Sequence, residues 1–266
     1  MESAAADKQN TEASSKVPPK TVIKDIRDIQ SDEDIYELVH DNVKQVLAKH
    51  GKYDFRGRPP KELEARPIHT FDWGDKYLGQ WDPKKDTIRG QGVYVTAVVG
   101  ELYEGYFKNS NFNGQGRHID SKGIIRQGKF KDGKLNGEGI YIRESIGKKH
   151  GCIYEGMFKN GQFDGKGTCK WTDGRDYEGF WTQDERDGQG EMTWPDGRYY
   201  KGKWKMGKRH GFGVMILPNN DRYEGQFQLD LMHGEGVYTT AKGKKSRGTW
   251  DHNIKQRKQS KCCVIF

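Results

Sequence analysis

Histidine beside glycine is the combination in this chain that most suggests chemistry. His150, His210 and His233 each stand directly before a glycine, and G-x-G recurs along the chain. Clustered histidines can bind a metal or move protons near neutral pH, and glycine-rich loops can hold phosphate. The phosphate-loop sequence G-x-x-x-x-G-K-[ST] is absent, however, and the glycines here precede strands rather than helices. We therefore predict turn histidines, no metal ligand, no cofactor and no catalytic residue.

The four cysteines are of two kinds. Cys152 and Cys169 stand alone, whereas Cys262 and Cys263 are adjacent. Because no C-x-x-C occurs, the sequence indicates neither a disulfide framework nor a zinc site. The last four residues, Cys263-Val-Ile-Phe, match C-a-a-X, and a final phenylalanine favours a geranylgeranyl group. We predict a prenyl group on Cys263 and regard Cys262 as a candidate for a reversible acyl chain.

Positive charge is concentrated in the tail. From Lys242 to Phe266 there are eight basic residues and one acidic residue, and the remaining 38 basic and 37 acidic residues almost cancel. A nucleic-acid-binding protein carries a basic groove, so we predict no nucleic-acid partner. The basic tail could hold a prenylated end at an anionic membrane surface. In the alternative reading, V-I-F packs on the last hairpin and the cations are solvated.

Most of these residues lie in or beside one repeated pattern: an aromatic residue, a glycine two residues on, an aromatic residue two further, and then G-x-G. The copies open 23 to 28 residues apart. They open at Tyr77, Tyr103, Arg126, Tyr154, Tyr177, Tyr200 and Tyr223, with a degenerate eighth copy at Ser246. Such a period is typical of repeat proteins, in which each unit packs only against its neighbours.

Within a repeat the residues alternate as they do in a β-hairpin. Tyr177, Gly179 and Trp181 share one face of a strand, and Gly188 and Gly190 share the same face of the returning strand. Glycines between rings leave a slot in which an aromatic side chain can lie across the neighbouring backbone. We predict a mainly β fold, an elongated single-layer antiparallel β-meander of about seven hairpins, preceded by one amphipathic α-helix.

The chain divides into five segments by composition. We expect a disordered arm at 1–20, a helical segment at 21–52, a Pro-rich connector at 53–72, the repeat array at 73–251 and a basic tail at 252–266. The helix should cover about 32–49, with Ser31 as its N-cap and an apolar face that includes Ile35, Val39 and Val43. That face could cap the first hairpin or dock on a partner.

Two regular copies carry a family resemblance: Y-E-G-M-F-K-N-G-Q-F-D-G-K-G at 154–167 and Y-K-G-K-W-K-M-G-K-R-H-G-F-G at 200–213. They closely resemble the MORN (membrane occupation and recognition nexus) repeat, and the resemblance covers about Trp73 to Asp251. It implies a twisted β-meander with an aromatic-lined groove. Similar arrays occur in junctophilins, plant phosphoinositide kinases, a SET-domain lysine methyltransferase, ciliary radial spoke head proteins and protist scaffolds, where they are proposed to bind acidic phospholipids or proteins.

The third repeat departs from this pattern. Arg126 and Gln127 stand where Tyr-Glu is usual, and an insertion lies around G-K-K-H-G. We expect a bend or an irregular turn there.

These observations predict a non-enzymatic scaffold for protein assembly, located in the cytoplasm and tethered to a membrane if the tail is prenylated. The segments outside the array are too short for a kinase or a methyltransferase domain. The predicted groove residues are the rings of the most regular repeats: Tyr154, Phe158, Tyr177, Trp181, Tyr200, Trp204, Tyr223 and Phe227. If the rings instead only stabilise the array, replacing Trp181 by alanine would unfold it rather than abolish binding. The alternative functions are a fixed component of a cilium or cytoskeletal assembly and a phosphoinositide-binding module.

Overall fold

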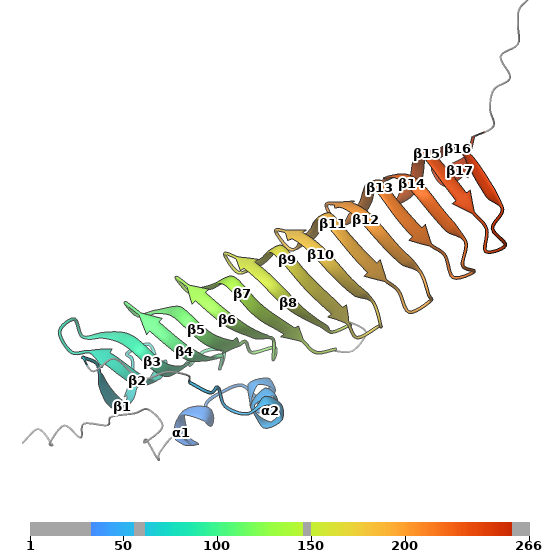
Figure 1. The fold of residues 1–266 in the computed structure, drawn as a ribbon. Helices are drawn as coiled ribbons and strands as arrows, with labels where there is room; N and C mark the ends of the chain where they lie inside the picture. The colour runs from blue at the N-terminus through green and yellow to red at the C-terminus, as the bar shows by residue number, and fades with distance from the viewer. Residues whose placement is uncertain (1–32, 56–61, 146–149, 257–266) are drawn as a thin grey trace, which may run out of the picture.

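The array is one long antiparallel sheet of 17 strands in which every strand pairs with its neighbours in the sequence (Figure 1). The computed structural model describes residues 33–55, 62–145 and 150–256. The strands are β1 (Glu64–Thr70), β2 (Lys76–Asp82), β3 (Thr87–Val95), β4 (Leu102–Lys108), β5 (Asn111–Ile119), β6 (Ile125–Lys131), β7 (Lys134–Arg143), β8 (Cys152–Lys159), β9 (Gln162–Trp171), β10 (Asp176–Thr182), β11 (Glu185–Thr193), β12 (Tyr199–Lys205), β13 (Lys208–Ile216), β14 (Arg222–Gln228), β15 (Leu231–Thr239), β16 (Lys245–Asp251) and β17 (Ile254–Lys255). The predicted meander is confirmed.

The sheet extends beyond the predicted limits of the array. The expected connector at 53–72 contains β1, which pairs with β2 from Glu64 opposite Trp81 to Thr70 opposite Lys76. Pro67 lies where the register shifts, so its missing N–H removes no regular ladder bond. At the other end β17 pairs with β16 inside the expected tail. Prolines are typical of a connector, but a proline at a register shift is compatible with a strand.

The helix expected at about 32–49 is present as two segments, α1 (Glu33–Tyr36) and α2 (Asp41–His50). His40 is extended between them and caps α2, because its Nδ1 accepts a hydrogen bond from the backbone N–H of Asn42 at 3.2 Å. The backbone N–H of His40 also donates to the carbonyl of Gly100. This contact with the connection between β3 and β4 coincides with the break in the helix. Ser31, the predicted N-cap, lies outside the described residues.

The N-terminal segment, residues 33–55, folds back on the array (Figure 1). Its buried side chains and those of β2 to β6 form one apolar cluster: Ile35, Val39, Val43, Val46, Leu78, Val93, Val95, Leu102, Ile119 and Ile125. The segment thus covers one face of several strands and does not simply close the end of the first hairpin. We call the sheet face that it covers the docking face.

The other face carries the aromatic residues of the repeats, and we call it the ring face. On this face the ring of Tyr177 lies across Gly179 of its own strand and Gly190 of the next. A Cβ atom at Gly190 would lie 2.3 Å from the Tyr177 hydroxyl oxygen. That hydroxyl donates to the carbonyl of Phe180 at 3.0 Å. The predicted glycine slot is confirmed, and Tyr77, Tyr103, Tyr154, Tyr200 and Tyr223 occupy slots of the same kind.

Candidate functional site

The rings of successive repeats form a row on the ring face. Tyr177 contacts Trp181 of its own strand edge to face, with 5.1 Å between ring centroids, and contacts Trp204 of the following hairpin in the same way at 5.5 Å. The same pair of contacts recurs at Tyr200 and Tyr223. Edge-to-face aromatic pairs contribute about 0.5 to 1.5 kcal/mol beyond the burial of their surface. Each tyrosine therefore joins its own repeat to the next.

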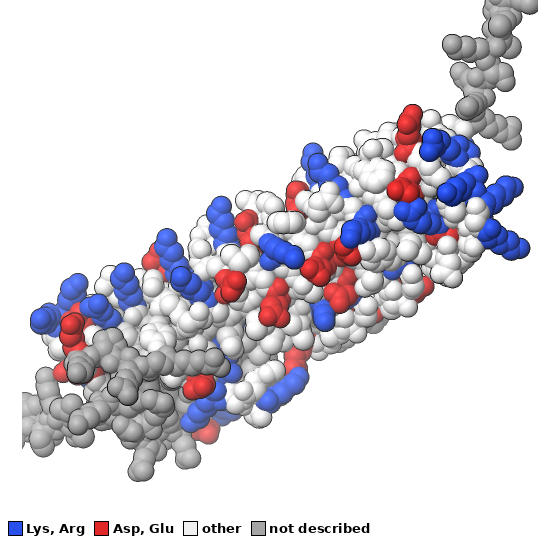
Figure 2. Space-filling view, in the orientation of Figure 1, with Lys and Arg blue, Asp and Glu red and all other residues white. Residues whose placement is uncertain are grey.

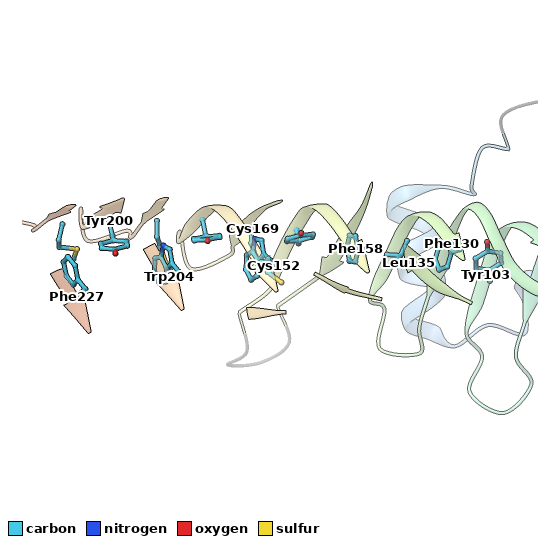
Figure 3. Packing of buried hydrophobic residues seen from close by; sticks show 14 of the residues in the cluster. Tyr103, Phe130, Leu135, Cys152, Phe158, Cys169, Tyr200, Trp204 and Phe227 are labelled. Atoms are coloured by element: carbon cyan, nitrogen blue, oxygen red, sulfur yellow. The ribbon is translucent and has the colours of Figure 1, made fainter. Parts of the chain in front are cut away.

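All eight predicted groove residues lie in this row, and all eight are buried. Their side chains are between 0% and 6% exposed: Tyr154, Phe158, Tyr177, Trp181, Tyr200, Trp204, Tyr223 and Phe227. Figure 3 shows several of them side by side along the array. Because their surfaces are covered by one another and by the glycine backbone, they leave almost no ring surface to a ligand. Their placement supports a structural role in joining repeats.

The row of rings is interrupted in the third repeat. Arg126 stands where the other repeats have tyrosine, and its guanidinium lies 5.6 Å from the ring centroid of Tyr141 and 3.0 Å from a carboxylate oxygen of Asp120. Phe130 contacts the ring of Tyr103 on its N-terminal side, but within the described residues no ring contact joins it to a later repeat. Leu135, which is 1% exposed, packs in the interrupted region. The ring of Tyr141, on the return strand of the same repeat, contacts Phe163 of the next repeat at 5.5 Å, so the gap in the row lies between Phe130 and Tyr141.

The docking face shows how this sheet binds a segment of protein. Glu104, from the Y-E-G of the second repeat, is fully buried. One of its carboxylate oxygens accepts hydrogen bonds from the Tyr36 hydroxyl and the Tyr53 backbone N–H, both at 3.1 Å. The other accepts from Arg117 at 2.9 and 2.6 Å, and Arg117 also donates to the carbonyl of Gly51. A repeat glutamate is therefore the polar anchor of the N-terminal segment.

Beyond the N-terminal segment the docking face is hollowed. A hollow of about 1000 Å³ beside Tyr53 shares Gln115 and Gln127 with a second one of about 790 Å³. The second shares Lys166 and Glu178 with a third of about 250 Å³. We call the second and third hollows together the open trough. Its lining combines acidic, basic and apolar side chains with glycine backbone, and the side chains include Glu138, Ile140, Glu155, Met157, Lys166, Glu178, Phe180, Glu191 and Lys201.

Sequence reasoning missed the open trough, although a signal for it exists. Met157 and Phe180 each stand between the glycine and the second aromatic residue of their repeats, at the position that alternation turns away from the rings. In the structure they are 37% and 48% exposed. Apolar residues on the polar side of an alternating strand were therefore the available signal for this surface.

The structure does not bring the three histidines together. His210 lies in β13 and His233 in β15, each at a strand bend before a glycine with positive φ, and not in the predicted turns. His150 lies 3.9 Å from Asp173, and His233 lies 3.6 Å from Asp251. Among the described residues no three His, Cys, Asp or Glu side chains are grouped as metal ligands would be.

Two further features bear on membranes. Cys262 and Cys263, the predicted lipidation sites, lie outside the described residues, so their modification stays a prediction. In the described part of the chain no helix is both long enough and apolar enough to span a bilayer. On the face seen in Figure 2, basic side chains lie beside acidic ones along the array.

Comparison with known proteins agrees with the repeat pattern. No curated protein sequence matches the chain. The solved structures similar to it include the TCP domain of Drosophila melanogaster SAS-4 in complex with a proline-rich motif of Ana2, at 13% identity and a TM-score of 0.33, covering 75% of this chain and 99% of that one. Another is a catalytically inactive virginiamycin B lyase from Staphylococcus aureus with quinupristin, at 11% identity and a TM-score of 0.14, covering 73% of each chain. Likeness at this level carries no argument about function.

The family model is more informative. The model of the MORN repeat matches six segments, 103–124, 127–145, 154–174, 177–197, 200–222 and 223–245. The hairpin that opens at Tyr77 precedes these matches, yet its ring occupies the same glycine slot and contacts Phe107 of the following hairpin at 5.2 Å. From its repeats and its 17-stranded meander, this chain is a member of the MORN-repeat proteins.

Proposed function

We propose that this protein is a non-enzymatic scaffold that binds protein partners along the open trough of its docking face. MORN repeats form scaffold modules that commonly bind proteins or membranes. The observation that carries the proposal is the N-terminal segment, which is a polypeptide already bound to this face through a repeat glutamate. The open trough continues the same face over later repeats.

The open trough repeats the chemistry of the occupied part. Glu155 and Glu178 hold the same place in Y-E-G as Glu104, but both are exposed. Beside them lie Met157 and Phe180, so carboxylates that could accept hydrogen bonds alternate with apolar surface that could be buried. Protein interfaces likewise combine apolar surface with hydrogen-bonding groups.

A protein partner is favoured over an acidic lipid surface. The described array mixes charges of both signs, and Lys166 and Lys201 in the trough are paired with Glu178 and Glu191 at 3.3 and 2.6 Å. Binding to anionic lipid depends on clustered, unpaired cations. The trough lacks such a cluster.

Comparative affinity purification tests the proposal. Met157→Glu with Phe180→Glu places two charges in the trough, and the control Met206→Glu with Leu229→Glu places two charges at exposed hairpin turns. We expect wild type and control to retain the same partners and the trough variant to lose them, with all three melting alike. Equal retention by both variants would contradict the trough as the binding surface.

A further inference from the structure

A pair of thiols lies inside the ring face, apart from the open trough. Cys152 of β8 and Cys169 of β9 are 6% and 1% exposed. Cys169 lies directly opposite Tyr154 in the sheet, and Cys152 precedes Tyr154 by two residues, so both side chains point to the ring face. Figure 3 shows the two side chains next to each other. Neither cysteine is in a disulfide.

The repeat geometry brings these two positions into contact in other hairpins too. In the first repeat the equivalent residues are Tyr94 and Asp75, and the tyrosine hydroxyl donates to the carboxylate at 2.5 Å. In the seventh repeat they are Tyr238 and Asp221, with the same hydrogen bond at 2.6 Å. In the second repeat the same two positions hold His118 and Glu101, which lie 3.2 Å apart. The contact is therefore built into the hairpin, and only in the fourth repeat are both of its members thiols.

The surroundings shift the pKa values of the two thiols in opposite directions. The hydrogen bond from the Cys169 thiol lowers the pKa of Cys152, with a further contribution from the positive charge of Arg143, which lies opposite Cys152 in the β7–β8 pair. The same hydrogen bond and burial raise the pKa of Cys169. A thiolate is the reactive form of cysteine. Cys152 lies opposite Arg143 and is the more exposed of the two thiols, 6% against 1%, which favours Cys152 as the nucleophile and Cys169 as the thiol that resolves its oxidised form.

We propose that Cys152 and Cys169 are a reversible dithiol–disulfide site: when a peroxide oxidises it, a disulfide bond links β8 to β9. The Cys152 thiolate attacks one oxygen of hydrogen peroxide, an S–O bond forms, the O–O bond breaks, and the departing hydroxide takes up a proton to leave as water. The Cys169 sulfur then attacks the Cys152 sulfur, an S–S bond forms, and the S–O bond breaks with release of a second water. The two thiols lose two electrons and the peroxide gains them. A dithiol reductant reverses the reaction.

The test uses the full chain with Cys262→Ser and Cys263→Ser, so that Cys152 and Cys169 are the remaining cysteines. After treatment of the folded protein with hydrogen peroxide we expect a loss of about 2 Da in intact mass, as formation of one disulfide requires. Peptide mapping should show Cys152 joined to Cys169, dithiothreitol should restore both thiols, and the oxidised form should melt at a higher temperature than the reduced form. In the Cys169→Ser variant, dimedone should label Cys152, whereas in Cys152→Ser, Cys169 should stay unlabelled.

Three results would overturn the proposal. The first is that both thiols of the folded protein remain open to alkylation after peroxide treatment. The second is that Cys152 passes to sulfinic acid with Cys169 present. The third is that the linked peptide forms only in guanidinium chloride. Because the mass and mapping measurements use the unsubstituted pair, they remain decisive even if Cys152→Ser or Cys169→Ser fails to fold.

Discussion

The hydroxyl oxygen of Tyr177 occupies the space that a side chain at Gly190 would need. The three atoms nearest to a Cβ at position 190 all belong to the Tyr177 ring, at 2.3 to 2.6 Å. Tyr177 cannot withdraw, because Trp181 and Trp204 lie against it.

Gly190→Ala should therefore destabilise the array through Tyr177. We expect a loss of about 3 kcal/mol in the free energy of unfolding, at the upper end of the usual cost of overpacking. In a Tyr177→Ala background the same substitution should cost at least about 1 kcal/mol less, because the clashing ring is gone. Urea denaturation of the four proteins gives both values, and an equal cost in the two backgrounds would refute the steric explanation.

Trp181 and Phe180 are neighbours in β10 with opposite roles. Trp181 contacts the rings of Tyr154 and Tyr177 and donates its indole N–H to the carbonyl of Gly167 at 3.2 Å. Trp181→Ala should lower the free energy of unfolding by about 3 to 5 kcal/mol. Phe180→Ala, on the exposed side, should cost less than about 1 kcal/mol. Thermal and urea unfolding of the two variants measures the difference in their stability. Equal destabilisation by the two substitutions would contradict the prediction.

Glu104→Gln should release the N-terminal segment. It leaves the buried Arg117 guanidinium without its counter-charge, and removing one partner of a buried ion pair typically costs about 3 to 5 kcal/mol. Glu155→Gln is the matched control, since Glu155 has the same place in its repeat but is exposed, and it should change stability by less than about 0.5 kcal/mol. Hydrogen exchange of residues 41–55 should accelerate only in Glu104→Gln. Unchanged protection there would show that Glu104 is not the anchor.

The buried tyrosines should make the array sensitive to alkali. Burial raises the pKa of Tyr223 to about 12, from a usual value of about 10, and raises the pKa of Tyr177 and Tyr200 as well. Below pH 10 these phenols are neutral in both the folded and unfolded states, so their contribution to stability is complete. As the pH rises above 10 the unfolded chain ionises first, and that contribution is progressively lost up to about pH 12. Absorbance at 295 nm should show the buried phenols ionising together with loss of β-sheet circular dichroism; separate ionisation in a folded array would contradict this.

The repeats could be predicted from the sequence because their contacts are local. Tyr177 and Gly190 are brought together by a single hairpin, so the period places the ring, the glycine slot and the return strand at once. The alternation of side chains along each strand also indicates which rings share a face. It does not show how much of each ring is buried, because part of that burial comes from the next repeat, as Trp204 covers Tyr177.

The docking of the N-terminal segment could not be predicted in the same way. An apolar helical face indicates that something covers Ile35 and Val43, but Tyr36 and Glu104 are 68 residues apart and the pattern names no partner. The break at His40 likewise coincides with a contact to Gly100, 60 residues on in the chain, that exists only in the folded protein. The contacts between the N-terminal segment and the sheet join residues far apart in the sequence. The repeat period alone therefore does not show which face of the sheet the segment covers, and that is the face on which the open trough lies.

The replacement of tyrosine by Arg126 leaves a gap in the row of rings inside one hairpin. In repeat proteins, stability is approximately the sum of terms for each unit and for each interface between neighbours. Ring contacts link the hairpins from Tyr77 to Phe130 and again from Tyr141 to Trp250, and among the described residues no ring contact joins Phe130 to Tyr141 of the same hairpin. The aromatic contribution to the coupling between units is therefore missing at one point of the ribbon, inside the hairpin of β6 and β7, where the backbone ladder and the pairing of Phe130 with Leu135 remain.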